Sequence, residues 1–202
     1  AQMSYQEVAY EVMSRFLTDF TEEELKKCIQ SAYDKKFDTD VIAPLVKADG
    51  AYYLELFHGS TIAFKDMALS ILPYLLTTAA KKNGVTNDIV ILTATSGDTG
   101  KAAMAGFADV PGTKIIDTEM KAELEEAGYQ FSSANSINIG RLVPQIVYYV
   151  YAYANLYKTG QIQQGEEINV VVPTGNFGNI LAAYYAKNMG LPIKKLICAS
   201  ND

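Results

Sequence analysis

The first part of the chain repeats apolar positions with the period of an α-helix. Over residues 4–17, apolar side chains recur every three or four positions, which predicts an amphipathic helix. Thr21 and Glu24 have the spacing of a capping box, and the apolar positions after them predict a second helix over residues 21–33. We therefore expect residues 1–50 to form a helical accessory part without chemistry of its own.

From residue 51 onward, short apolar runs alternate with helical patterns. The runs that predict strands lie at 52–56, 89–92, 114–116, 168–172 and 195–199. The patterns that predict helices lie at 63–82, 101–108, 139–157 and 180–189. Such an alternation is typical of parallel sheets covered by helices. Residues 51–202 are therefore predicted to form a single α/β part.

The junction between Ile116 and Asp117 interrupts this alternation. The strand predicted at 114–116 runs directly into Asp117-Thr118-Glu119-Met120, which has the composition of a helix start, and no loop separates them. We expect that residues are missing at this junction. We also expect the 202 residues to be one part of a longer protein.

Composition and charge exclude several classes of function. The net charge is -6, from 17 basic and 23 acidic side chains, and no segment is rich enough in lysine and arginine to suit nucleic acid. No uncharged apolar run is long enough to cross a bilayer. Cys28 and Cys198 form neither a zinc motif nor a disulfide pattern. We therefore expect a cytoplasmic protein, a monomer or homodimer, that binds neither nucleic acid nor membrane and holds no metal.

Lys65 lies at the start of an otherwise apolar helix, after the loop Phe57-His58-Gly59-Ser60-Thr61-Ile62-Ala63-Phe64. An apolar environment removes the hydration of an ammonium group, and a helix N-terminus disfavours positive charge. Both effects favour a neutral, nucleophilic amine, so Lys65 is a candidate for forming an imine. The alternative is an ordinary lysine whose stem packs while its amine reaches water.

Two glycine-containing loops precede helices and are candidates for anion binding. The loop Thr95-Ser96-Gly97-Asp98-Thr99-Gly100-Lys101 offers hydroxyls and backbone N–H groups that suit a phosphate or a carboxylate. It is not a nucleotide-binding P-loop, because that motif requires glycine in place of Thr95 and serine or threonine in place of Ala102. The loop at 174–179 predicts either a phosphate cradle or a plain tight turn.

Taken together, these loops resemble those of the threonine synthases, a branch of the fold-type II pyridoxal phosphate enzymes. The resemblance is carried by residues 57–66, 92–103, 135–149 and 171–185, and it extends to the N-terminal helices. It implies an α/β fold like that of the tryptophan synthase β subunit, with parallel sheets covered by helices and the active site between two subdomains. It also implies a lyase that converts O-phospho-L-homoserine and water to L-threonine and phosphate.

The resemblance assigns roles to individual residues. It implies that Lys65 is catalytic and forms the Schiff base with pyridoxal 5'-phosphate. The residues implied to hold the cofactor phosphate are Gly175, Asn176, Phe177, Gly178 and Asn179. The residues implied to bind substrate are Ser96, Gly97, Asp98, Thr99, Gly100, Ser136, Asn138 and Arg141. For Arg141, capping of a helix or pairing with a nearby acid stays open. Ser60 and Asn179 depart from the proline and aspartate expected in many relatives.

Two other functions remain as alternatives. One is another fold-type II enzyme, such as a serine/threonine dehydratase or cysteine synthase, although those usually carry asparagine within the loop that is Ser-Gly-Asp-Thr-Gly here. The other is a protein of the same fold that binds phosphorylated small molecules without catalysis. His58, the only histidine, suits a general base by its ordinary pKa, but the resemblance gives that task to lysine, so we favour a structural role.

Overall fold

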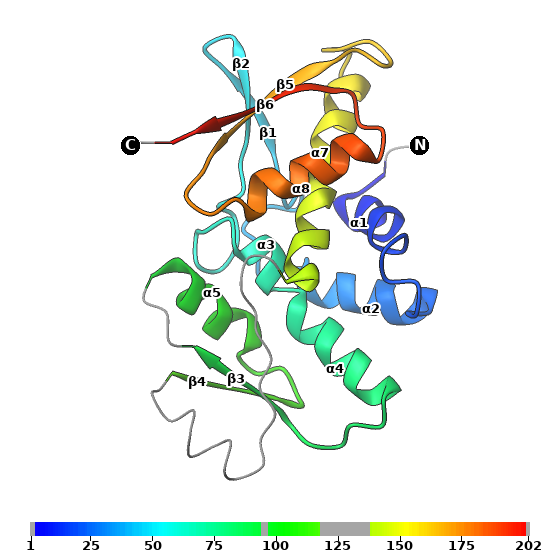
Figure 1. The fold of residues 1–202 in the computed structure, drawn as a ribbon, viewed down its shortest axis with the longest axis vertical. Coiled ribbons are helices and arrows are strands. Elements are labelled where there is room, and N and C mark those ends of the chain that lie inside the picture. The colour runs from blue at the N-terminus through cyan, green and yellow to red at the C-terminus, as the bar shows by residue number, and fades with distance from the viewer. Residues whose placement is uncertain (1–2, 94–96, 118–137, 201–202) are drawn as a thin grey trace.

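The structure is a computed structural model that describes residues 3–93, 97–117 and 138–200 (Figure 1). Its helices are α1 (Tyr5–Met13), α2 (Glu22–Ala32), α3 (Asp66–Leu69), α4 (Leu72–Lys82), α5 (Asp98–Phe107), α7 (Ile139–Lys158) and α8 (Gly178–Asn188). Its strands are β1 (Leu45–Ala48), β2 (Ala51–Leu54), β3 (Ile89–Thr93), β4 (Thr113–Asp117), β5 (Ile168–Pro173) and β6 (Ile193–Ala199).

Local sequence signals explain where most helices begin. The predicted capping box at α2 is confirmed, because Thr21 and Glu24 each bond the other's backbone N–H, at 3.2 and 2.9 Å. The single helix predicted over 63–82 is wrong, since α3 ends at Leu69 and α4 begins at Leu72. Pro73 explains the break, because it has no N–H to offer the carbonyl of Leu69.

Two predicted helices begin earlier than expected, and one strand was not predicted. α5 begins at Asp98 and α8 at Gly178, so part of each predicted glycine loop is the first turn of a helix. β1 lies within residues 1–50, which we expected to be helical, so that prediction is wrong for this segment, where the chain pairs antiparallel with β2. The parallel strands that were predicted are confirmed, in the pairs β3–β4 and β5–β6.

β4 passes through the junction at which the sequence predicts missing residues. Its ladder with β3 continues to the pair Thr93–Asp117. The helix start predicted after Asp117 lies outside the described residues, so the missing segment stays a prediction.

Helix α7 is the central support of the fold (Figure 1). α1, α3, α4 and α8 all pack against it. Its residues Val143 and Val147 are fully buried in a core that also takes side chains from α1, α2 and α8. A smaller core joins α3 and α4 to β3 and α5. Among the described residues, no helix is both long and apolar enough to cross a membrane.

Candidate functional site

Lys65 is the residue immediately before α3, at the predicted helix start. Its backbone is already helical, with φ -64° and ψ -24°, and its side chain is half-buried. The Nζ lies 5.4 Å from the centre of the Phe64 ring. The amine therefore borders an aromatic face on one side and is partly open to a ligand.

Asp66 braces the loop that leads to Lys65. Its side chain is only 2% exposed. Its Oδ2 accepts a hydrogen bond from the backbone N–H of Thr61, and its Oδ1 accepts one from the Thr61 hydroxyl, both at 2.7 Å. Gly59 packs so closely that an added Cβ would lie 2.5 Å from the Asp66 Cβ. The carboxylate thus fixes the loop against the first residue of α3, next to the reactive amine.

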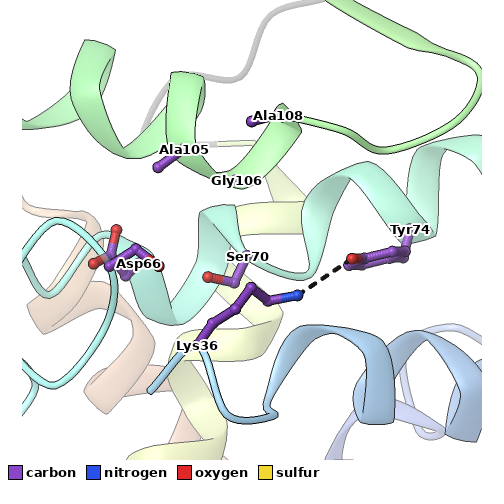
Figure 2. A pocket seen from close by; sticks show the side chains of 8 residues that line it. Lys36, Asp66, Ser70, Tyr74, Ala105, Gly106 and Ala108 are labelled. Carbon is purple, nitrogen blue, oxygen red and sulfur yellow. Dashed lines mark hydrogen bonds between the residues drawn. The ribbon is translucent and has the colours of Figure 1, made fainter. Parts of the chain in front are cut away.

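A small cavity lies between α3, α4 and α5, and Asp66 is one of the residues that line it (Figure 2). Its volume is about 30 Å³, which leaves room for water and not for an aromatic cofactor. Figure 2 shows Ser70, the residue after α3, beside Lys36, whose Nζ donates to the Tyr74 hydroxyl at 3.4 Å. The lining residues are Lys36, Ser60, Asp66, Ser70, Tyr74, Ala105, Gly106 and Ala108. This cavity belongs to the packing of α3, α4 and α5.

A larger hollow of about 430 Å³ lies between α1 and α2. None of the predicted site residues lines it. Lys26 on its wall pairs with Glu22 at 2.5 Å, and Glu7 is used in the capping box of α1. Because no predicted site residue lines it and three of its charged groups are engaged in local structure, we assign this hollow no part in the predicted chemistry.

The turn between β5 and α8 presents backbone donors to solvent. Gly175, Asn176 and Phe177 are exposed, and within the described residues no protein acceptor takes a hydrogen bond from their N–H groups. A Cβ added at Gly175 would meet nothing within 4 Å. Phe177 caps α8 without a side-chain hydrogen bond, so the helix N-terminus is open as well. Such a turn has the donors and the space to bind an anion.

The first turn of α8 is tied to α7 through Asn179. Its Oδ1 accepts hydrogen bonds from the hydroxyls of Tyr148, at 2.7 Å, and Tyr149, at 2.5 Å. The two tyrosines therefore share one acceptor on the neighbouring helix. No local sequence pattern predicts this contact, because about thirty positions separate the tyrosines from Asn179.

The predicted substrate-binding residues lie at the starts of α5 and α7. Gly97 precedes α5 with φ 89°, a value that favours glycine, while Ser96 and Ser136 lie outside the described residues. Asn138 caps α7, accepting from the N–H of Gly140 at 2.8 Å. Arg141 is 3% exposed, and this burial lowers the pKa of its guanidinium. The capping role considered for Arg141 is thus performed by Asn138.

His58 connects two segments near the loop of Lys65, its own segment with Glu55 and the one that contains Asp38. Its Nε2 lies 2.9 Å from Glu55 and its Nδ1 lies 2.5 Å from Asp38. Hydrogen bonding to Glu55, and secondarily to Asp38, raises the pKa of the imidazole. Both ring nitrogens are engaged, which supports the structural role that we favoured.

Several candidate residues lie on α7 or next to helices that pack against it. It packs against α3, which follows Lys65, and against α8, which follows the open turn. Asn138 and Arg141 lie at its own first turn. The sequence analysis did not identify the contact of Asp66 with Thr61. The signal that could have revealed it is an aspartate within an otherwise apolar helix, since such a carboxylate needs a partner if it is buried.

Comparisons with known proteins find similar sequences and a similar solved structure. A family model described as the threonine synthase N terminus matches residues 1–33. The threonine synthase of Schizosaccharomyces pombe is 34% identical over 98% of this chain and 48% of its own length. Threonine synthase-like 1 of Homo sapiens is 36% identical over 88% of this chain and 31% of its own. The crystal structure of PLP-bound threonine synthase from Brucella melitensis superimposes with a TM-score of 0.86 at 33% identity, over 98% of this chain and 50% of that one.

The chain spans about half the length of the threonine synthases it matches and about a third of threonine synthase-like 1. The alignment with the S. pombe protein runs over 248 positions, whereas this chain has 202 residues, so at least 46 positions of that relative have no counterpart here. This difference favours the prediction that an internal segment is missing, although its place at residues 116–117 stays a prediction.

Proposed function

We propose, on the premise that this chain belongs to the threonine synthase family, with its fold-type II α/β architecture, that the protein is a pyridoxal phosphate-dependent lyase. It converts O-phospho-L-homoserine and water to L-threonine and phosphate. The observation that supports this most is that the helix after Lys65 (α3) and the helix after the open, donor-rich turn (α8) both pack against α7. We also infer a cytoplasmic enzyme that acts as a monomer or homodimer.

The residues present fit pyridoxal phosphate. Lys65 supplies a primary amine for the aldehyde carbon of the cofactor, and the braced loop holds that amine beside the Phe64 ring. The N–H groups of Gly175, Asn176, Phe177 and Gly178 suit the phosphate, with Asn179 in the same turn. When bound, the cofactor supplies an electron sink for charge that develops at the substrate α-carbon.

The remaining steps require protons to move and charge to be neutralised. In its neutral form, the Lys65 amine takes and returns protons at the α- and β-carbons of the substrate. The N-terminus of α5, at Gly97 to Gly100, suits the substrate carboxylate, with Ser96 before it. Arg141 suits the phosphate, because a guanidinium offers paired donors in a fixed plane. Ser136 and Asn138 complete that group.

Burial makes Arg141 more effective in this role. With 3% of the residue exposed, its charge is little screened by solvent, and a phosphate dianion offers strong compensation for its lost hydration. The same charge stabilises the phosphate as it leaves the γ-carbon.

The central test is Lys65→Ala in the full-length protein. We expect the visible absorbance of lysine-bound pyridoxal phosphate and the release of phosphate from O-phosphohomoserine both to disappear, whereas Lys114→Ala, an exposed lysine on β4, retains both. Retention of both signals in Lys65→Ala would refute the assignment.

Substrate specificity is tested separately. Wild-type protein is expected to release phosphate from O-phosphohomoserine and to form little pyruvate from serine or ketobutyrate from threonine. The opposite preference identifies a dehydratase, and a colourless protein that binds O-phosphohomoserine identifies a non-catalytic binder.

A further inference from the structure

Two buried tyrosines of α7 direct their hydroxyls at a single oxygen. Tyr148 is completely buried and Tyr149 is 8% exposed. Both hydroxyls donate to Asn179 Oδ1, at 2.7 and 2.5 Å. An amide oxygen has two lone pairs, so these two donors use its full capacity.

This arrangement constrains the position of α8 strongly. Neighbouring residues of a helix point about 100° apart, since a turn takes about 3.6 residues. Tyr148 and Tyr149 reach one atom only because Asn179 lies between their two directions. Burial raises the pKa of both phenols, so both remain protonated donors at neutral pH.

Asn179 is the second residue of α8, directly after the open turn at 175–178. The N–H groups of that turn bind an anion well only if they converge on one point, and a small rotation of the first turn of α8 spoils this convergence. The hydroxyl pair is a polar contact that ties this first turn to the central helix α7, beside the apolar packing of Ile180.

We propose that Tyr148 and Tyr149 are positioning residues for cofactor binding, because they hold Asn179 and thereby orient the backbone donors that receive the cofactor phosphate. The inference rests on the proposed function. In this scheme neither tyrosine touches the cofactor.

The test compares pyridoxal phosphate with pyridoxal, which lacks the phosphate, by absorbance titration of the full-length protein. In Tyr149→Phe and in Tyr148→Phe/Tyr149→Phe, we expect the dissociation constant for pyridoxal phosphate to rise by about tenfold, while that for pyridoxal stays unchanged. Asn179→Leu is expected to behave like the double variant. Tyr153→Phe removes a hydroxyl of the same helix that donates to the carbonyl of Glu166 at 3.0 Å, and as the matched control it is expected to retain wild-type affinity for both compounds.

The inference is overturned if both compounds lose affinity equally in Tyr149→Phe, since that result indicates general packing, or if neither compound loses affinity. It is also overturned if Tyr153→Phe loses as much affinity for pyridoxal phosphate as Tyr149→Phe. Tyr149→Phe decides the matter by itself if the double variant does not fold. A wild-type protein that attaches neither compound at Lys65 overturns the proposed function, and this inference with it.

Discussion

Two glycine-containing turns of this molecule offer similar N–H donors, but among the described residues only one of them has an acceptor within the protein. In the turn before Lys65, the backbone N–H and hydroxyl of Thr61 bind the buried carboxylate of Asp66. In the turn before α8, the N–H groups at 175–177 bind no acceptor among the described residues. Gly59 has no space for a side chain, whereas Gly175 has open space around it.

The difference separates a turn completed by the protein from a turn left for a ligand. The carboxylate of Asp66 is an internal anion that satisfies its donors when the chain folds, so the loop of Lys65 is rigid before any ligand arrives. The turn before α8 leaves its N–H donors available to an external anion. It is held in place through Asn179, which accepts hydrogen bonds from Tyr148 and Tyr149 of α7. A catalytic amine and a phosphate site thus receive different kinds of support.

The largest effect is expected from removing the internal anion. Asp66→Ala deletes two hydrogen bonds to a buried charged group and leaves the Thr61 N–H without its acceptor. We expect the free energy of unfolding to fall by about 3 kcal/mol. Urea denaturation of the full-length protein measures this, with Asp88→Ala on the surface as a control that shifts it by less than about 0.5 kcal/mol. Equal midpoints for the two variants would show that Asp66 does not brace the loop.

The next effect comes from filling the space at Gly59. Gly59→Ala places a methyl group 2.5 Å from the Asp66 Cβ, so we expect a loss of about 2 kcal/mol. Gly175→Ala is the matched control for stability, because neither glycine has a positive φ and the added Cβ meets nothing there.

A double-mutant cycle sharpens the argument. With Asp66→Ala already present, the clash at Gly59 is relieved in part, so the second substitution is expected to cost clearly less than it does alone. Strict additivity of the two losses in urea denaturation would contradict the contact.

The third prediction concerns the open turn. At ten times its dissociation constant, inorganic phosphate is expected to stabilise the wild-type protein by about 1.4 kcal/mol. Phe177→Pro removes one N–H donor at a φ of -71°, which proline adopts, and is expected to weaken phosphate binding about tenfold. Phe177→Ala retains the N–H and is expected to bind phosphate normally, since the ring is 66% exposed. Thermal unfolding with phosphate or chloride at equal ionic strength is the measurement, and equal protection of both variants would show that the turn is not the anion site.

The sequence predicted those elements of the structure that local patterns and family motifs specify. The capping box at Thr21 and the long helix α7 follow from residues close together in the chain. The break at Pro73 was overlooked, because the apolar period continues across it. The contact of Tyr148 and Tyr149 with Asn179 could not be predicted, since it depends on how α7 and α8 pack, and that packing leaves no pattern along the chain.

The smallest effect is expected from pH, through His58. Hydrogen bonds to Glu55 and Asp38 raise the pKa of its imidazole in the folded protein above the ordinary value of about 6.5. Below that value both folded and unfolded chains are protonated, and the stabilisation is fully present. As pH rises, the unfolded chain loses its proton first, so the stabilisation decreases until pH passes the raised pKa of the folded protein.

His58→Gln isolates this contribution. Glutamine still bonds one carboxylate without titrating, so the decrease in stability above pH 6.5 is expected to become shallower than in the wild type. The difference is small because Asp38 is 74% exposed and solvent screens its charge. Urea midpoints measured at several pH values provide the comparison. Parallel pH profiles for the two proteins would mean that His58 connects its two segments without carrying a charge, so that the loop of Lys65 receives its ionic support from Asp66.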